Sequence, residues 1–335
     1  MKQNKKCILV TGCAGFIGYH LALKLLNNNF KVVGIDNVNN YYSKKLKLDR
    51  IKDIKKNLAS KNKSFTFLRV DLNNKKILDK IFKKYNFNKV IHLAAQAGVR
   101  YSLLYPERYL KNNILCFFNI LECCRKFKIS KLIFASSSSV YGNLNKNQFS
   151  EKDSTDNPIQ FYAATKKSNE VMAHAYSALY GIHCIGLRFF TVYGPWGRPD
   201  MSIFKFTKNI LENKPIDIFN KGKHERDFTY IADVCSAVLK LSDNKYKKKQ
   251  IKFEIFNIGN SKPEKLTKLI ELLEKLLNKK AKKNYLGLQK GDVKKTFSDI
   301  SSLQKKINFK PKTKLKNGLK HFVSWYKKYY KVKPS

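Results

Sequence analysis

The sequence lacks an apolar run long enough to cross a lipid bilayer. A spanning helix needs about 20 apolar residues, and the longest apolar stretches, at 7–10 and 114–121, are much shorter. Lys2, Lys5 and Lys6 lead directly into a strand-like segment, so the N-terminus does not resemble a secretory signal. We therefore expect a cytoplasmic protein without membrane insertion.

The sequence also lacks a C-x-x-C pair, although it contains 7 cysteines. That number is odd, and several cysteines, such as Cys116, Cys123 and Cys124, lie in apolar segments, where a free thiol behaves as a small hydrophobic group. The pattern indicates neither a disulfide framework nor a zinc site. We expect no metal cofactor.

Acidic residues are scarce. The chain has 24 Asp and Glu residues against 68 Lys and Arg residues, and its formal net charge is +44. Such an excess can attract nucleic acid, anionic membranes or phosphorylated small molecules. The lysines occur in scattered pairs and short runs, such as 55–56, 83–84 and 247–249, which favours a solvated surface over a nucleic-acid interface.

Short β-branched or apolar runs alternate with helical patterns through the first 190 residues. The expected strands are 7–11, 31–36, 65–70, 90–93, 132–136 and 184–188, and the expected helices include 17–27, 77–85, 106–127 and 162–180. Such alternation predicts parallel strands joined by right-handed helical crossovers. We expect the α/β class, with a Rossmann-like doubly wound parallel sheet over 1–190 and a smaller mixed α/β substrate-binding domain over 191–330. A segment near 228–258 is a candidate to return to the first domain.

A glycine motif of the form G-x-x-G-x-x-G joins the first expected strand to the first expected helix. Its glycines are Gly12, Gly15 and Gly18. Glycines in this context let the backbone approach a pyrophosphate at the helix N-terminus. The second strand ends at Asp36, where a carboxylate can accept hydrogen bonds from ribose hydroxyls and would repel a 2′-phosphate. NAD is therefore favoured over NADP, although an aspartate before Asn37 could also only form a turn.

Tyr162 and Lys166 are four residues apart and therefore share one face of an expected helix. A lysine ammonium beside a tyrosine favours the tyrosinate, which can act as a general base. Such a pair alone is common on surface helices. It gains weight from the serine cluster 136–139 at the end of the fifth strand, where ligands of open α/β sheets gather. We assign Ser137 to hydrogen-bonding the reacting oxygen, although serines there could only cap a turn.

Together with these features, further motifs carry a resemblance that spans almost the whole chain. They are HLAAQAGVR at 92–100, RFFTVYGP at 188–195, RDFTY at 226–230 and GDV at 291–293. The chain resembles the extended short-chain dehydrogenase/reductase family, and within it more closely the UDP-glucuronate 4-epimerases. This resemblance implies an NAD-dependent isomerase that inverts C4 of a UDP-sugar, giving UDP-galacturonate through a transient 4-keto intermediate. It also implies a role in polysaccharide biosynthesis.

The resemblance further implies roles for individual residues. Tyr162 removes the 4-hydroxyl proton, Lys166 also holds the nicotinamide ribose, and Asp71 and Leu72 lie at the adenine. The remaining cofactor contacts that it implies are Phe16, Ile17 and Asn37. The implied substrate contacts are Ser138, Ser139, Thr191, Arg198, Arg226 and Asp292.

Within that substrate set, Arg226 would pair with the UDP phosphates and Arg198, in the segment RPDM at 198–201, with the sugar carboxylate. Arg198 could also be a loop residue that only covers surface. Ser138 and Ser139 stand where related dehydratases and decarboxylases carry acids, which argues for epimerisation alone. Gln289-Lys290, Ala232 and Trp196-Gly197 depart from the usual pattern of the family.

Several alternatives stay open at this point. They are a 4-epimerase for UDP-glucose or a UDP-N-acetylhexosamine, a UDP-glucuronate decarboxylase and a non-enzymatic NAD-sensing regulator. The helices 106–127 and 162–180 carry apolar residues on more than one side, which fits a homodimer with a four-helix interface, as in relatives of this family. Burial within the monomer would explain the same pattern.

Overall fold

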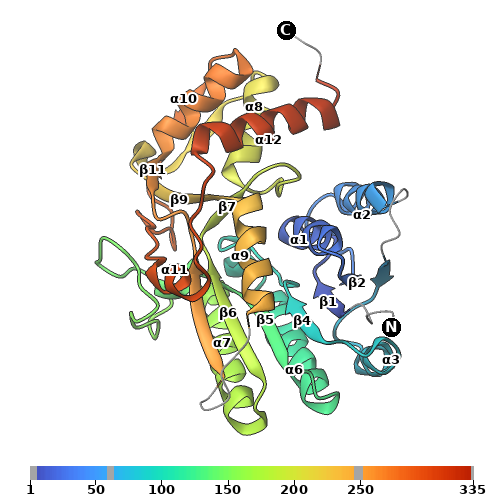
Figure 1. Ribbon diagram of the computed structural model, residues 1–335. Helices are drawn as coiled ribbons and strands as arrows, with labels where there is room; N and C mark the ends of the chain where they lie inside the picture. Colours follow the sequence, from blue (N-terminus) through green and yellow to red (C-terminus); the bar gives the residue numbers. More distant parts are fainter. Residues whose placement is uncertain (1–5, 59–63, 245–251, 333–335) are drawn as a thin grey trace. The chain divides into compact units, whose positions relative to one another are not determined.

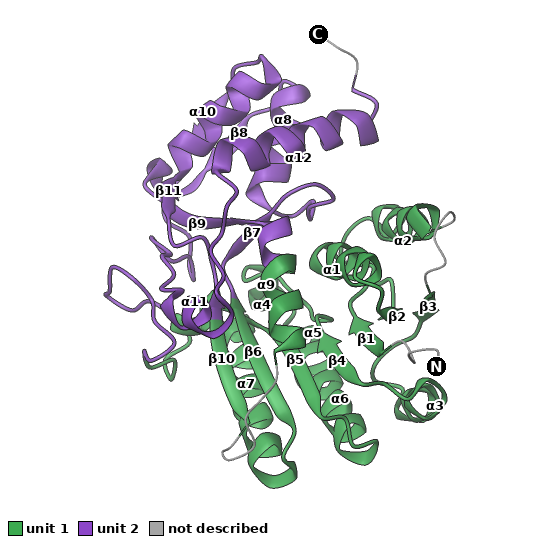
Figure 2. Ribbon diagram, viewed as in Figure 1, with its two compact units in different colours: residues 1–142, 154–188, 235–256 green, residues 143–153, 189–234, 257–335 purple. Residues whose placement is uncertain are grey.

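The computed structural model describes residues 6–58, 64–244 and 252–332 (Figure 1). Its contacts divide the chain into two compact units (Figure 2). Unit 1 contains 1–142, 154–188 and 235–256, and unit 2 contains 143–153, 189–234 and 257–335. Lys2, Lys5 and the lysine run 247–249 lie outside the described residues.

Unit 1 is built on a sheet with the strand order β10-β6-β5-β4-β1-β2-β3. The strands are β1 (Cys7–Thr11), β2 (Lys31–Asp36), β3 (Phe65–Arg69), β4 (Lys89–His92), β5 (Lys131–Ser137), β6 (His183–Phe189) and β10 (Phe253–Ile258). β1 pairs in parallel with both β2 and β4. The chain therefore winds outward from β1 in two directions, which confirms the doubly wound sheet and gives it a switch point beside β1.

The strands form where apolar residues run without interruption. All five residues of β1 are buried, as expected for a parallel strand that is covered on both faces. The helices of this unit are α1 (Phe16–Asn27), α2 (Lys44–Leu58), α3 (Lys75–Tyr85), α4 (Tyr101–Leu104), α5 (Pro106–Tyr109), α6 (Cys116–Lys126), α7 (Phe161–Tyr180) and α9 (Ile231–Asp243). α2 is an additional helix whose buried stripe, with Leu46, Ile51 and Ile54, lies between lysines.

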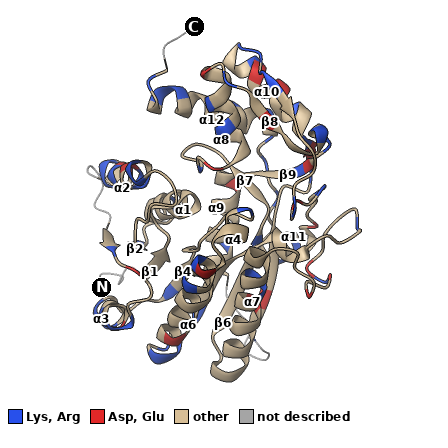
Figure 3. Cartoon of the chain, turned by 180° about the vertical axis from the view of Figure 1, so that it is seen from behind, with Lys and Arg blue, Asp and Glu red and all other residues tan. Residues whose placement is uncertain are grey.

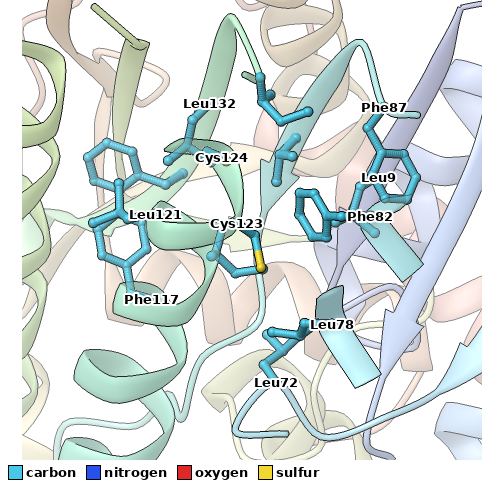
Figure 4. Close-up of a cluster of buried hydrophobic side chains, with 14 of the residues drawn as sticks. Leu9, Leu72, Leu78, Phe82, Phe87, Phe117, Leu121, Cys123, Cys124 and Leu132 are labelled. Atoms are coloured by element: carbon cyan, nitrogen blue, oxygen red, sulfur yellow. The ribbon is translucent and has the colours of Figure 1, made fainter. Parts of the chain in front are cut away.

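The core of unit 1 contains side chains from strands and helices together (Figure 4). Leu9 of β1 and Leu132 of β5 are fully buried, as are Phe117 and Cys124 of α6. All seven cysteines lie in the described part of the chain, where they are buried free thiols. They therefore fill the interior as small apolar groups.

The expected helix over 106–127 is helical from 106 to 126, but it is not α-helical throughout. Between α5 and α6 the chain forms a π-helical segment, η1 (Leu110–Leu115). In η1 the buried Asn113 accepts a hydrogen bond from the Gln96 backbone N–H at 2.8 Å and donates one to Thr165 Oγ1 of α7 at 3.0 Å. A π-helical turn is wider than an α-helical one and is frequent at functional sites, and here its polar residue joins a loop to α7.

Unit 2 has two small sheets and its own core. Its elements are β7 (Thr191–Tyr193), α8 (Ser202–Leu211), β8 (Ile216–Ile218), β9 (Glu225–Tyr230), β11 (Pro263–Lys265), α10 (Leu266–Leu277), β12 (Lys283–Tyr285), α11 (Ser301–Ile307) and α12 (Leu315–Tyr329). β9 pairs in parallel with β7 and antiparallel with β11. Phe204, Leu273 and Phe322 belong to its core, so this unit is a mixed α/β structure.

Lys and Arg residues are distributed over many elements of both units, including α2, α3, α6 and α10 (Figure 3). Among the described residues no helix combines the length and apolar character that a membrane span requires. The described residues likewise contain no group of three or more His, Cys, Asp or Glu side chains placed to hold a metal ion.

Candidate active site

The glycine motif forms a tight turn between β1 and α1. Gly12 has a φ of +69°, and a Cβ there would lie 2.7 Å from the backbone nitrogen of Ala94. A Cβ on Gly18 would lie 2.2 Å from the carbonyl oxygen of Gly12. Glycine is therefore required at these two positions because strand, turn and helix approach too closely for a side chain.

The same turn presents the N-terminus of α1. Gly15 precedes the helix without a side-chain cap, and the first bond of α1 runs from the Tyr19 N–H to the Gly15 carbonyl. The N–H groups of Phe16, Ile17 and Gly18 therefore precede the first intrahelical bond. With the helix dipole they form a site suited to an anion, so the turn fits the pyrophosphate of a dinucleotide.

Asp36 lies at the end of β2, where its carboxylate is tied to the glycine turn. It accepts hydrogen bonds from the N–H groups of Ala14 at 3.1 Å and Val38 at 2.8 Å. The bond from Val38 forms the turn that is the alternative role of Asp36. The bond from Ala14 joins the carboxylate to the glycine motif. Burial raises the pKa of Asp36, and the two backbone bonds and the nearby Lys47 charge oppose that rise.

The neighbouring candidates Asn37, Asp71 and Leu72 lie together. Asn37 Nδ2 donates to Asp71 Oδ2 at 3.3 Å, and Asp71 also accepts from the Asn73 backbone and side chain. Burial alone would raise the pKa of Asp71, but these hydrogen bonds leave it lowered. The Leu72 carbonyl accepts from Asn119 Nδ2 of α6 at 2.9 Å, so hydrogen bonds join these candidates to α6.

Tyr162 and Lys166 are both on α7, as expected. Lys166 is 2% exposed, and its Nζ donates to the Ala135 carbonyl oxygen of β5 at 2.9 Å. Burial lowers the pKa of Lys166 to about 8, against the opposing charge of Glu170. The Tyr162 ring lies edge-on to Tyr109, with the ring centroids 6.0 Å apart. A half-buried tyrosine and a buried lysine of lowered pKa thus share this helix.

Ser137 ends β5 beside that anchored lysine. Its Oγ accepts from the Ser139 N–H at 3.1 Å and donates to Ser139 Oγ at 3.1 Å. Ser137 therefore caps the short 3-10 helix η2 (Ser138–Tyr141), the role that we had weighed against a catalytic one. The cap uses the acceptor capacity of the hydroxyl, and its proton is given to Ser139 Oγ, so a catalytic role requires the hydroxyl to turn from Ser139 towards the sugar oxygen.

Two polar residues of this region were missed by sequence reasoning. His92 at the end of β4 is buried, and its Nδ1 lies 2.9 Å from Thr11 Oγ1. Burial and the Lys166 charge lower the pKa of His92 to about 3, so its ring is neutral. Glu170 is buried on α7 against Arg188 of β6. Each residue finds its partner on a different element, and no local motif reveals such a pairing.

The arginine candidates belong to unit 2. Arg198 lies in a loop where Gly197 N–H donates to the Gly194 carbonyl, and its guanidinium forms a two-point ion pair with Asp200. Arg226 on β9 donates through Nη1 to the carbonyl oxygens of Glu225 and Lys294, both at 3.0 Å. Both guanidinium groups are thus held by neighbouring residues.

The other candidates are placed on the same two units. Thr191 begins β7, where its register partner is Phe228 of β9. Asp292 lies in a turn in which its N–H donates to the Gln289 carbonyl at 3.1 Å. Ser138 and Ser139 belong to unit 1.

Comparison with known proteins places the chain among sugar-nucleotide enzymes. Residues 8–259 match the model of the NAD dependent epimerase/dehydratase family. An uncharacterized protein of Methanocaldococcus jannaschii, MJ1055, is 52% identical over 96% of each chain. UDP-glucuronate 4-epimerase 2 of Arabidopsis thaliana is 46% identical over 98% of this chain and 77% of the relative.

A solved structure has the same fold. It is the UDP-glucuronic acid 4-epimerase of Bacillus cereus in complex with UDP-glucuronic acid and NAD. The match covers 97% of this chain and 100% of that one, with a TM-score of 0.88 and 37% identity. The similarity therefore extends over both units rather than over the dinucleotide-binding part alone.

Proposed function

Because the chain belongs to the NAD dependent epimerase/dehydratase family, we propose that it interconverts UDP-glucuronate and UDP-galacturonate by epimerisation at C4. The observation that carries this proposal is the Tyr162 and Lys166 pair on α7, with Lys166 anchored to the end of β5. It occurs in a chain whose fold matches a 4-epimerase crystallised with UDP-glucuronic acid and NAD.

Unit 1 carries the residues that would hold NAD. The N–H groups that open α1 bind the pyrophosphate, Asp36 accepts from the ribose hydroxyls, Asp71 and Leu72 lie at the adenine, and Lys166 holds the nicotinamide ribose. Bound NAD supplies a reversible hydride acceptor at C4. The carboxylate of Asp36 already accepts two backbone N–H groups, so its orientation is fixed before a ribose arrives.

Tyr162 acts as the base on the 4-hydroxyl group. The buried ammonium of Lys166 favours the tyrosinate electrostatically because its charge lies in a region of low dielectric. Ser137 hydrogen-bonds the same sugar oxygen and keeps it in line with Tyr162. Tyr162 holds the proton while the 4-keto sugar turns over, and returns it when C4 is reduced on its other face, so no net redox change results.

The substrate contacts proposed for unit 2 include two basic residues, Arg226 and Arg198. Arg226 binds the UDP phosphates, and Asp292 completes this end of the site. Arg198 binds the sugar carboxylate, with Thr191, Ser138 and Ser139 as neutral donors. Nε and Nη2 of Arg198 are engaged by Asp200, so the sugar carboxylate would have to displace Asp200 or bind another side of the guanidinium.

We propose that the protein is a cytoplasmic homodimer that supplies UDP-galacturonate to polysaccharide biosynthesis. Exposed apolar side chains support the dimer: Leu104 of α4 is 71% exposed, and Val171 and Leu179 of α7 are 57% and 72% exposed. Leu110 and Leu115 of η1 are also exposed. Such side chains on the helices of one unit are typical of a helix-packed interface. The scattered lysines give no support to nucleic acid as a partner.

The proposal is tested by incubating the purified protein with UDP-glucuronate and NAD and resolving the products by NMR. We expect UDP-galacturonate without CO2, and no turnover by Tyr162→Phe. Formation of UDP-xylose or a UDP-4-keto-pentose would instead assign a decarboxylase. Turnover of neutral UDP-hexoses alone would assign a different 4-epimerase, and salt-sensitive nucleic-acid binding without any turnover would favour the regulator.

A further inference from the structure

Glu170 lies one helical turn after Lys166 on α7 and is 4% exposed. Positions four residues apart share one face of a helix, so Glu170 faces the same strands as the lysine. A carboxylate removed from water is stable only with charged or hydrogen-bonding partners. The partners of Glu170 therefore show which elements its carboxylate connects.

The partners of Glu170 come from β6 and β5. Arg188 of β6 donates through Nε to Glu170 Oε1 at 2.9 Å and through Nη2 to Oε2 at 2.8 Å. Ser136 of β5 donates through Oγ to Glu170 Oε1 at 2.5 Å. Arg188 is itself 4% exposed, and its guanidinium carbon lies 4.8 Å from the centre of the Tyr141 ring. Glu170 therefore joins α7 to two strands in a dry environment.

These contacts continue into the proposed catalytic group. Lys166 holds the Ala135 carbonyl, Glu170 holds the Ser136 hydroxyl, and Ser137 follows directly along β5. Three successive residues at the end of β5 are thus fixed by α7 or by the turn that follows. A loss of the Glu170 contact would release the strand at the residue before Ser137.

We propose that Glu170 is a positioning residue whose charge and hydrogen bonds hold Lys166 and the end of β5 in the arrangement that the chemistry of Tyr162 requires. This inference rests on the proposed function, since it assigns Glu170 a role in that same site. Glu170 acts through Lys166 and Ser136.

The electrostatic part of this role has a definite sign. The negative charge of Glu170 favours the ammonium form of Lys166, whereas burial disfavours it. His92 of β4 also faces Lys166, but its lowered pKa leaves it neutral. Without the charge of Glu170, Lys166 and Arg188 would be two buried cations lacking this counterion. Lys166 would then lose its proton at lower pH, and tyrosinate formation at Tyr162 would shift to higher pH.

The test uses the NAD-loaded protein with Glu170→Gln and with the double variant Glu170→Gln, Arg188→Met. The single variant leaves Arg188 buried without its carboxylate partner and can lose stability for that reason. The double variant removes both charges of the ion pair and leaves no buried guanidinium without its carboxylate. We expect kcat to fall roughly tenfold to a hundredfold in both variants with KM little changed, since the loss concerns positioning. The alkaline limb of the pH profile should also move to lower pH.

A second readout is independent of turnover. Tyrosinate formation at Tyr162 is followed by ultraviolet difference absorbance, with Tyr162→Phe in each background as the reference. Without substrate, we expect tyrosinate formation at Tyr162 to occur at higher pH in the double variant than in the parent. If the double variant has the parent's kcat, pH profile and Tyr162 ionisation, the inference is wrong. A shifted ionisation in a protein that fails to epimerise UDP-glucuronate would refute the proposed function and support the role of Glu170.

Discussion

Lys166 Nζ donates to the carbonyl oxygen of Ala135 at 2.9 Å, so the buried lysine of α7 is anchored to β5 two residues before Ser137. The bond couples the helix that carries Tyr162 to the strand that carries the serine. It also satisfies one of the three ammonium protons of a side chain that is buried. The bond to Ala135 therefore fixes the position of the lysine ammonium group.

Replacing Lys166 by methionine should abolish most activity while the side-chain volume is nearly kept. Without the ammonium the tyrosinate of Tyr162 is no longer favoured, and we expect kcat to fall by roughly a hundredfold to ten-thousandfold. The measurement is UDP-glucuronate turnover by NMR. Lys167→Met on the same helix is the matched control, because Lys167 is bonded to Thr155 Oγ1 on a half-exposed part of α7. Equal losses in both variants would contradict the role of Lys166.

Replacing Asp36 by asparagine should weaken NAD binding and improve the relative binding of NADP. The variant keeps the shape of the side chain but loses the charge that would accept from ribose hydroxyls and repel a 2′-phosphate. A charge-assisted hydrogen bond contributes about 1.5–3 kcal/mol, so the Kd for NAD should rise roughly tenfold to a hundredfold. Calorimetric titration of both nucleotides measures this, with Asp49→Asn on α2 as control. An unchanged preference would leave Asp36 as a turn residue alone.

The sheet of unit 1 could be predicted from sequence because its signals are local. The run CILVT of β1 and the glycines that follow determine a strand, a turn and a helix without reference to distant residues. Asp36 was identifiable for the same reason, since it ends the next strand. Local sequence patterns were therefore sufficient to predict the glycine turn and Asp36, the candidate NAD-binding part of the site.

The rest depends on contacts that no local pattern encodes. The π-helical segment η1 reads in sequence as part of an ordinary helix, and its Asn113 is explained only by Gln96 and Thr165, which lie far away in the chain. No local pattern predicts that Glu170 pairs with Arg188, because their pairing requires α7 to pack on β6. Arg198 and Asp200 are close in sequence, but their pairing depends on the turn around Gly197.

Replacing Arg198 by alanine should damage both rate and fidelity. A 4-keto uronate loses CO2 readily when its carboxylate can rotate, so a residue that holds this group prevents decarboxylation as well as aiding binding. We expect a raised KM for UDP-glucuronate and detectable UDP-pentose in the product NMR spectrum. Lys208→Ala on α8 is a control that removes an exposed cation from the same unit. Normal epimerisation without any pentose would remove Arg198 from the carboxylate site.

Alkaline pH should destabilise the protein through its buried thiols. Burial raises the pKa of Cys184 and Cys235 to about 12 from an ordinary value of 9.0. Above pH 9.0 the unfolded chain loses these protons while the folded chain keeps them, so the free energy of unfolding falls as pH rises from 9.0 towards about 12. Each such thiol contributes at most about 1.4 kcal/mol per pH unit. Urea unfolding with reductant should show a shallower fall for Cys184→Ala, and an identical slope would contradict this assignment.

A charge placed on the exposed apolar surface of α7 should dissociate the proposed dimer. Leu179 is 72% exposed, and a glutamate there would have to be buried without a partner in a helix-packed interface, which is unfavourable. We expect Leu179→Glu to sediment as a monomer with an unchanged circular dichroism spectrum, while the parent sediments as a dimer. Leu288→Glu is the matched control, since Leu288 is 45% exposed but belongs to unit 2. The monomer should retain NAD, because the candidate site residues of unit 1 all come from one chain. A parent protein that sediments as a monomer would refute the proposed dimer.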